Sequence, residues 1–413
     1  MIFKSEGIKG CVCGKDHGLT TRLAVVESGA MSHLDEYLSE YGISGKSVAI
    51  YDENTYRAKG LVRPEADFEI ILSPEGLHAD EHGVGSALEK MPEDADYLIA
   101  VGAGTIHDIT RYIAHGRGIP FVSCPTAASV DGFCSSVAAM TWGGFKKTFT
   151  ATAPTLVVAD TEVIRQAPMR LGASGFGDMI GKYIALSDWK IANILIGEYL
   201  CPEIYAMTLS ATESVLAATE GIRAGAPEAF EKLTYGLLMS GIAMQLLGNS
   251  RCASGAEHHI SHIIEMSPEP LSVSSDMLHG EKVGVGTLLL SDEYHRFVES
   301  DIEKLGDYIP ASESYIRDAF GDRLAGSIIK ENEVDSCKGI TREHILEKLD
   351  EIRAVVDAIP TKDELITAYD TVGALKSLEE LGVSGDKRDM LFEYSPLVRN
   401  RLTLMRIRRG AMR

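Results

Sequence analysis

The residue types best suited to chemistry gather between Ser254 and Lys282, a stretch that holds four of the chain's 12 histidines. His258 and His262 are four positions apart, so on a helix both project from the same face one turn apart. His279 follows after a proline-containing loop, and the carboxylate of Asp178 lies upstream in GFGDMIGKYIALSDW. Two imidazoles and one carboxylate from different segments indicate a three-ligand metal site with an open position, as a catalytic ion needs.

The spacing leaves two questions open. A histidine pair at helical spacing also occurs as two packed histidines without a metal, and the pattern does not decide which of His258, His259 and His262 is the ligand. The donor set does not identify the ion either, since one aspartate with two histidines accommodates Zn²⁺, Ni²⁺ or Fe²⁺.

Length and composition predict a two-domain α/β enzyme. The chain has 413 residues, too many for one ordinary core, and it is 45% hydrophobic with few aromatics. The net charge of −20 makes nucleic acid and anionic membranes poor partners. We expect no signal peptide and no membrane span, because the N-terminus lacks an apolar core and no run of about 20 apolar residues occurs. Seven scattered cysteines favour reduced thiols and a cytoplasmic location.

The order of elements predicts a parallel sheet followed by helices. Helical periodicity is expected over 20–42 and 85–91, and after the glycines of ADYLIAVGAGT. Strands are expected at 46–55, 67–73, 95–105, 119–126 and 155–160, with a β-hairpin at 137–150 around Gly143 and Gly144. After Asp160 helical periodicity dominates. We therefore expect a Rossmann-like dinucleotide-binding domain at 1–165 and an all-helical metal- and substrate-binding domain at 166–413. The basic C-terminal tail is interpreted as a solvated or dipole-complementing helix end, with the alternative that at least one arginine reaches a phosphate.

Polar strand ends indicate where a nucleotide would bind. VGAGTIHD lies between a strand and a helix, where a glycine-rich turn and a helix N-terminus can hold a phosphate, although it is not a full GxGxxG. Asp52 closes an earlier strand and could accept hydrogen bonds from a ribose diol, and SCPTAASVDGFCSS follows another strand. Asp52 could instead be an ordinary strand-terminal aspartate. SCPTAASVDGFCSS could instead be an ordinary helix start capped by a hydroxyl side chain.

A second group of soft ligands lies near the N-terminus. Cys11, Cys13 and His17 fall within seven residues and could bind zinc. No fourth ligand follows at the spacing of a structural site. We interpret the segment as a turn at the mouth of an N-terminal strand.

Several motifs together resemble one family. VGAGTIHDITRYIA, PTAASVDGFCS, GFGDMIGKYIALSDW, SGAEHHISH and LHGEKVGVGT are similar to the superfamily of dehydroquinate synthase and the metal-dependent polyol dehydrogenases. Within it the chain most resembles the sn-glycerol-1-phosphate dehydrogenases, particularly the bacterial ones. The early CVCGKDH and the RNRLTLMR tail belong to the likeness, which covers most of the chain in consistent order.

The resemblance assigns roles to residues. It implies metal ligation by Asp178, His258 and His279, and a place for His262 in the substrate pocket. Asp131 would lie beside the nicotinamide and substrate, with Asp131 or a water held by His262 as the proton path. The cofactor-binding positions implied are Asp52, Gly102, Gly104, Thr105, Asp108, Thr126, Ser129 and Ser135. Ala103 stands where relatives often have a third glycine.

The activity implied is reversible reduction of dihydroxyacetone phosphate to sn-glycerol 1-phosphate with NAD or NADP and one divalent ion, zinc or nickel, in a homodimer. Lys182, one helical turn after Asp178, could reach the substrate phosphate or instead form an i,i+4 ion pair with Asp178. Lys146, Lys147 and Arg399 are further cations. The alternatives are a glycerol dehydrogenase, a dehydroquinate synthase-like lyase and a non-catalytic metal- or dinucleotide-binding regulator.

Overall fold

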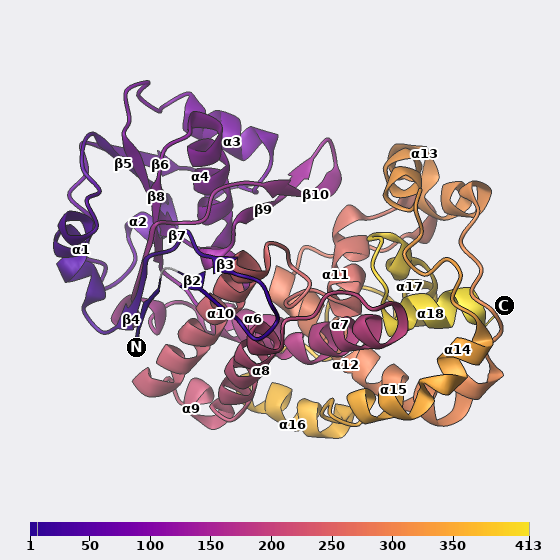
Figure 1. Cartoon of the computed structure of the whole chain (residues 1–413). Helices are drawn as coiled ribbons and strands as arrows, with labels where there is room; N and C mark the ends of the chain where they lie inside the picture. The colour runs from indigo at the N-terminus through magenta and orange to yellow at the C-terminus, as the bar shows by residue number, and fades with distance from the viewer. Residues whose placement is uncertain (6, 413) are drawn as a thin grey trace.

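The chain forms one mixed sheet followed by a large helical part (Figure 1). The structure is a computed structural model that describes residues 1–5 and 7–412. Its seven-stranded sheet has the order β1-β4-β11-β8-β7-β5-β6. The strands are β1 (Ile2–Lys4), β4 (Leu23–Glu27), β5 (Ser47–Asp52), β6 (Phe68–Leu72), β7 (Tyr97–Gly102), β8 (Phe121–Pro125) and β11 (Leu156–Asp160). All pairs are parallel except β1 with β4.

The register brings the polar strand ends to one edge. Asp52 at the end of β5 pairs with Leu72, and Gly102 at the end of β7 pairs with Pro125 at the end of β8. Helices α3 (Glu81–Leu88) and α4 (Gly104–Arg117) pack on one face of the sheet, and α1 (Leu34–Glu40) on the other. The short α2 (Glu53–Tyr56) follows β5 directly. The predicted parallel sheet with crossover helices is confirmed.

The helix expected over 20–42 is wrong. Its first part is the buried strand β4, LAVVE, which lies between β1 and β11, and only Leu34–Glu40 is α-helical, after a 3₁₀ turn at Ala30–His33. A strand covered on both faces has a continuous apolar run without alternation, which periodicity cannot distinguish from a buried helix.

The hairpin around the glycine pair is confirmed. Strand β9 (Val137–Trp142) pairs with β10 (Phe145–Thr150), and Gly143 and Gly144 have φ of 59° and 74°, as a primed two-residue turn requires. The hairpin extends from the sheet toward the helical part (Figure 1). There Arg323 donates to the Gly144 carbonyl at 2.9 Å. A smaller hairpin pairs β2 (Gly7–Ile8) with β3 (His17–Gly18).

After Asp160 the described residues form helices and no strands. The helices that build the site are α6 (Met169–Ile180), α7 (Lys182–Ile196), α10 (Pro227–Leu247), α11 (Ala256–Met266) and α12 (His279–Arg296). The others are α5 (Thr161–Ile164), α8 (Pro202–Leu216), α9 (Thr219–Arg223), α13 (Glu313–Glu331), α14 (Arg342–Glu347), α15 (Leu349–Val356), α16 (Lys362–Val372), α17 (Arg388–Tyr394) and α18 (Leu404–Ala411). The domain division at 165 stays a prediction.

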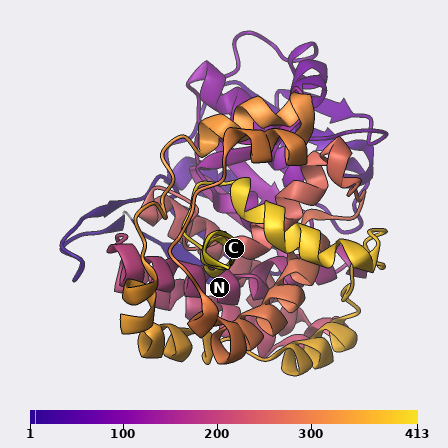
Figure 2. The same ribbon diagram turned by 90° about the vertical axis from the view of Figure 1, so that its right-hand side faces the viewer.

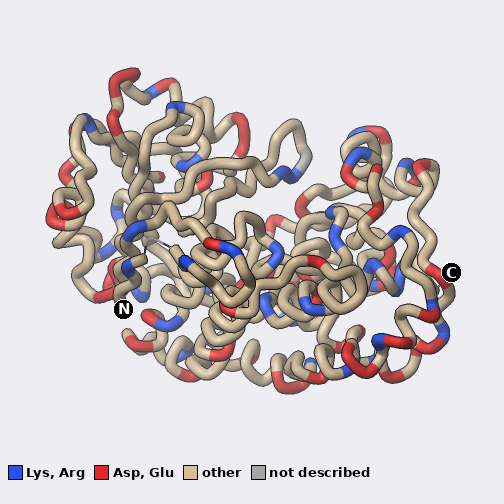
Figure 3. The backbone as a smooth tube through the Cα atoms, viewed as in Figure 1, with Lys and Arg blue, Asp and Glu red and all other residues tan. Residues whose placement is uncertain are grey.

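The C-terminal tail is packed into the protein, so the solvated reading is wrong. The yellow segment with α17 and α18 lies across the helical part in Figure 2. Arg406 is fully buried with its guanidinium 2.8 Å from Asp335, and Arg409 is also buried. Acidic segments are spread widely over the rest of the chain, and the β9–β10 hairpin carries a basic one (Figure 3).

Glycines set the distance between the two helices that carry Asp178 and His279. A Cβ added at Gly177 in α6 would lie 2.4 Å from the carbonyl oxygen of Gly280 in α12, and one at Gly280 would lie 2.0 Å from the Ser174 carbonyl. Only residues without a side chain permit this approach. The crossing therefore places the end of α6 against the start of α12.

Candidate metal and nucleotide site

Three side chains from three helices meet at one point. Asp178 lies near the end of α6, His258 in the first turns of α11 and His279 at the start of α12. One potential ligand atom from each lies within 4.8 Å of the others. Asp178 is fully buried, while the His279 side chain keeps 27% of its surface exposed. The arrangement fits a metal site that is closed by protein on one side and open to a ligand on the other.

Two glutamates orient the histidines. Glu257 Oε1 lies 2.7 Å from Nδ1 of His258, and Glu265 Oε1 lies 2.8 Å from Nδ1 of His279. A carboxylate at Nδ1 fixes the tautomer in which Nε2 carries the free lone pair, a common arrangement behind metal-bound histidines. Sequence reasoning identified neither glutamate. Glu257 directly precedes His258, so its position in the sequence could have found it, whereas Glu265 meets His279 only after α11 and α12 have packed together.

Lys182 forms the predicted ion pair with Asp178 and is not free to bind a substrate phosphate. Its Nζ lies 2.8 Å from Oδ1 of Asp178 and 2.8 Å from Oδ2 of Asp131, and its side chain is fully buried. Burial by itself would lower the pKa of Lys182, but the two carboxylates outweigh it and the pKa is raised. Burial would likewise raise the pKa of Asp178, yet the charges of Lys182 and His258 hold it below its usual range.

Asp131 is locked beside the triad by further contacts. Its backbone N–H donates to Oδ2 of Asp178 at 2.9 Å, and Ser240 donates to its carboxylate at 2.8 Å. The loop before it is pressed against α6, since a Cβ at Gly175 would lie 2.0 Å from the Ala128 carbonyl. The sheet-derived loop and the helical part therefore share one polar centre.

The other two histidines of α11 are not in the triad. His259 is fully buried and neither ring nitrogen has a hydrogen-bond partner in the described structure. His262 lines the cleft with its ring centroid 6.0 Å from that of His258, and its buried Nδ1 also lacks a partner. Burial, followed by the charge of Arg399, lowers the pKa of His262 well below its usual value.

A cleft next to the triad lies between the β9–β10 hairpin and the helical part. Its lining includes Asp108, Asp131, Ser135, His258, His262, His279, Arg399 and Arg401. Arg401 donates to the Ser254 carbonyl at 3.0 Å and to Ser250 Oγ at 2.8 Å, whereas Arg399 lies 3.4 Å from Thr148 Oγ1. Burial, followed by the nearby Arg251 and Arg399, lowers the pKa of Arg401 to about 10. Among the described residues, neither Arg399 nor Arg401 has a carboxylate at ion-pair distance, although Asp108 and Asp131 line the same cleft.

The cofactor-binding candidates lie at the carboxyl edge of the sheet. Gly102 ends β7, and Gly104 and Thr105 begin α4, whose N-cap Ala103 makes no side-chain capping bond. The Thr126 N–H donates to the Gly102 carbonyl at 3.0 Å, and the side chains of Thr126, Ser129 and Ser135 are buried in the connection after β8. A free helix N-terminus beside a glycine turn can receive a phosphate group.

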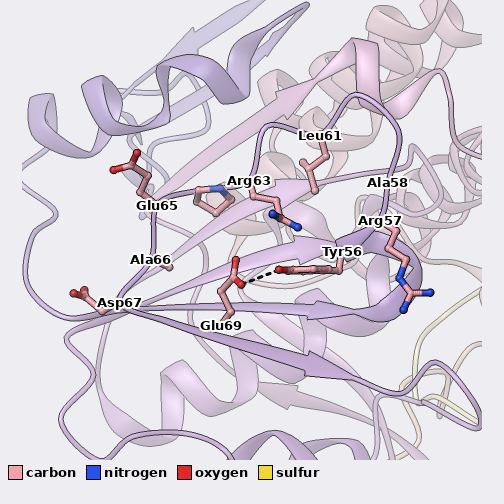
Figure 4. Close-up of a pocket in the computed structure, with 10 residues that line it drawn as sticks. Tyr56, Arg57, Ala58, Leu61, Arg63, Glu65, Ala66, Asp67 and Glu69 are labelled. Carbon is pink, nitrogen blue, oxygen red and sulfur yellow. Dashed lines mark hydrogen bonds between the residues drawn. The ribbon is translucent and has the colours of Figure 1, made fainter.

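Two acidic candidates have structural partners as well. Asp52 caps α2, accepting from the N–H groups of Asn54 and Thr55 at 2.8 and 2.9 Å through Oδ1. Asp108 pairs with the buried Arg111 at 2.5 Å while it lines the cleft. A shallow hollow lies beyond α2, between Tyr56 and Glu69, whose side chains are hydrogen-bonded at 3.1 Å (Figure 4). None of the triad residues lines it.

Comparison with known proteins identifies the class and then the family. Residues 25–168 match the family model of iron-containing alcohol dehydrogenases. The fold resembles an iron-containing alcohol dehydrogenase of Corynebacterium glutamicum (TM-score 0.60, 16% identity, 94% of this chain and 91% of that one). It also resembles a sulfoacetaldehyde reductase of Bifidobacterium kashiwanohense solved with NAD⁺ (TM-score 0.58, 14% identity, 95% and 97%). The fold is thus that of the iron-containing alcohol dehydrogenases.

Curated sequences narrow the assignment. The chain is 34% identical over 406 residues to a glycerol-1-phosphate dehydrogenase [NAD(P)+] of Halalkalibacterium halodurans, covering 96% of this chain and 94% of that protein. It is 40% identical over 311 residues to the enzyme of that name from Bacillus licheniformis, covering 73% and 77%. The chain belongs to the glycerol-1-phosphate dehydrogenase family. In the described residues, no helix is long and apolar enough to cross a membrane.

Proposed function

We propose that the protein is an NAD(P)-dependent, metal-dependent dehydrogenase that interconverts dihydroxyacetone phosphate and sn-glycerol 1-phosphate. The observation that carries the proposal is the neighbourhood of two features in one cleft. His258 and His279 of the metal triad line one wall of the cleft, and the guanidinium groups of Arg399 and Arg401, which have no carboxylate at ion-pair distance among the described residues, line another. A small phosphorylated ketone needs both.

The triad fits a divalent ion by its donors and by its outer contacts. It combines one carboxylate with two imidazoles whose Nδ1 atoms are held by glutamates. When bound, the ion supplies Lewis-acid polarisation of a substrate oxygen. We infer that the ion is zinc or nickel. The donor set suits both ions, and the resemblance to the bacterial members of the family favours including nickel.

We assign the substrate phosphate to Arg399 and Arg401, in place of Lys182. The Lys182 ammonium is enclosed by Asp178 and Asp131 and has no exposed surface, so it serves to neutralise these two carboxylates. The two arginines line the cleft without a carboxylate partner among the described residues. Guanidinium groups bind phosphate oxygens in paired hydrogen bonds, which favours a substrate phosphate at this wall.

The proton and nucleotide sites follow from the remaining polar groups. Among the described residues, His262 Nδ1 has no hydrogen-bond partner, so His262 would hold a water near the substrate, and this water or Asp131 would provide the proton path. Gly102, Gly104 and Thr105 would bind the pyrophosphate, and the hydroxyls of Thr126, Ser129 and Ser135 would line the nicotinamide side. Asp52 would accept from the ribose. In this arrangement the hydride comes from the cofactor and the cleft orients the ketone toward it.

We also infer a cytoplasmic homodimer. None of the seven cysteines forms a disulfide, and six of them are buried, as in proteins of a reducing compartment. The dimer rests on the resemblance to the family.

Substrate comparison tests the activity. Metal-loaded protein should oxidise NADH or NADPH with dihydroxyacetone phosphate and yield the sn-1 phosphate ester, identified by chiral analysis. Comparable rates with dihydroxyacetone would indicate a glycerol dehydrogenase instead. Turnover of a phosphorylated heptulosonate, without net use of NADH, would indicate a dehydroquinate synthase-like lyase. Binding of NADH and metal with no turnover would indicate a regulator.

A further inference from the structure

A second cluster of metal-binding side chains lies outside the cleft, and the activity above makes no use of it. Cys11, Cys13 and His17 belong to the β2–β3 hairpin and the turn within it, whereas Cys201 is the N-cap residue of α8. One ligand atom from each of the four lies within 4.8 Å of the others. The hairpin alone offers three ligands, and folding supplies the fourth from 190 positions away.

The distances fit a tetrahedral ion. The sulfur atoms of Cys11 and Cys201 are 3.5 Å apart, and Cys13 Sγ lies 3.2 Å from His17 Nε2. With Zn–S bonds near 2.3 Å, two thiolates on one zinc ion are about 3.7 Å apart. A disulfide needs a separation near 2.05 Å, so the cysteine pair has the spacing of shared ligands.

Neighbouring groups orient the cluster. Nδ1 of His17 lies 2.7 Å from the Leu246 carbonyl at the end of α10, which leaves Nε2 directed at Cys13. The Tyr199 hydroxyl donates to Cys13 Sγ at 3.0 Å. Such contacts behind the ligands are typical of metal sites rather than of chance groups of thiols.

The turn that carries the two hairpin cysteines is built around glycine. Gly14 has φ of 83° and its N–H donates to the Cys11 carbonyl at 2.9 Å, which closes a tight turn over Cys11-x-Cys13. The turn directs both sulfur atoms to one side, where Cys201 is fully buried and Cys11 is 5% exposed. Lys15 lies with its Nζ 3.4 Å from the centre of the Tyr199 ring, whose hydroxyl donates to Cys13 Sγ.

We propose that Cys11, Cys13, His17 and Cys201 bind one zinc ion as a closed structural site. Four protein ligands leave no open coordination position, so the ion has a structural and not a catalytic role. Three thiolates and Zn²⁺ carry one net negative charge, which the nearby Lys15 partly balances. The site would fasten the N-terminal hairpin to α8 and to the end of α10 in the helical part. CVCGKDH forms a turn, as its sequence predicts, and the proposal adds a zinc ion bound by that turn.

The first test separates this ion from the one in the cleft. Protein carrying both Asp178→Ala and His279→Ala should still contain one zinc per chain by elemental analysis, and X-ray absorption should show three sulfurs and one nitrogen around it. Adding Cys13→Ser or Cys201→Ser should remove that zinc, whereas Cys337→Ala, at a buried cysteine outside the cluster, should leave it in place. These readouts do not depend on dehydrogenase activity, so failure of the proposed function leaves them unaffected.

A second test uses the unaltered protein, in case the cysteine variants fold poorly. Modification of the thiols with a mercurial should release one zinc per chain, detected with a colorimetric chelator. Cobalt loaded in its place should give an intense sulfur-to-cobalt charge-transfer band. A zinc content that disappears with Asp178 and His279, an absorption spectrum without sulfur ligands, or a Cys11–Cys201 disulfide found by mass spectrometry would each overturn the proposal.

Discussion

Lys182 Nζ lies 2.8 Å from Oδ1 of Asp178, inside the group of side chains that forms the proposed metal centre. The same ammonium lies 2.8 Å from Asp131, so one buried cation serves the buried carboxylate of Asp178 and the partly exposed carboxylate of Asp131. These two contacts of Lys182 join α6 and α7 of the helical part to the loop that follows β8. It stabilises the site before any ligand enters it.

Replacement of this lysine should therefore destabilise the protein more than it weakens substrate binding. Lys182→Met leaves two carboxylates without a cation, and loss of one partner of a buried ion pair costs about 3–5 kcal/mol. Urea unfolding measures the loss. Lys190→Met, on the same helix but without an ion-pair partner in the described structure, is the control and should change little. If Lys182→Met mainly raised KM for dihydroxyacetone phosphate at unchanged stability, Lys182 would be the phosphate ligand after all.

Arg401→Met should weaken the phosphorylated substrate selectively. Its guanidinium faces the cleft, and a hydrogen bond to a charged group contributes about 1.5–3 kcal/mol, which corresponds to about a 10- to 150-fold rise in KM. Steady-state kinetics with dihydroxyacetone phosphate and with dihydroxyacetone measure the difference, and only the first should change. Arg388→Met, at a half-exposed arginine of α17, is the matched control. Equal losses with both substrates would remove Arg401 from the phosphate site.

Glu265→Gln should reduce metal affinity without removing a ligand. The glutamate holds His279 Nδ1 at 2.8 Å, and changes behind a metal ligand typically cost about 10- to 100-fold in affinity. Competition with a fluorescent chelator measures the dissociation constant. Glu269→Gln, a nearby exposed position, should leave the constant unchanged. An unchanged constant in Glu265→Gln would mean that this contact does not orient the histidine.

Gly177→Ala should disturb the site through the helix crossing. The added methyl would lie 2.4 Å from the Gly280 carbonyl, so α6 and α12 must separate, and overpacking of this kind costs about 1–3 kcal/mol. Both thermal stability and metal affinity should fall, because Asp178 and His279 move apart. Gly116→Ala in α4, where an added Cβ meets nothing within 4 Å, should be neutral or slightly stabilising. Full metal affinity in Gly177→Ala would show that the crossing does not set the site.

Local pattern predicted those parts of the fold that short segments determine. The glycine pair at 143–144 predicted the hairpin, and the alternation of strands and helices predicted the sheet. The strand β4 was missed because its continuous apolar run has no period of its own, and only its neighbours β1 and β11 define it as a strand. Local sequence carries no information about such neighbours.

The residues of the site likewise fall into those that the sequence predicted and those that it did not. Family resemblance identified Asp178, His258 and His279, and the structure brings their ligand atoms together. The residues that could not be predicted are those whose partners come from distant elements. Glu265 reaches His279 only through helix packing, and Cys201 joins Cys11 across 190 positions of the chain. Their side chains have no spacing signal, because the relation exists only in the folded chain.

The most direct test of the central claim is metal dependence with the triad altered. Protein stripped of its exchangeable metal and supplied with Zn²⁺ or Ni²⁺ in turn should regain NADH oxidation with dihydroxyacetone phosphate. The same treatment of Asp178→Ala or His279→Ala, shown to be folded by circular dichroism, should restore no activity. Restoration of wild-type rates in either variant would contradict the assignment of these side chains as the metal ligands.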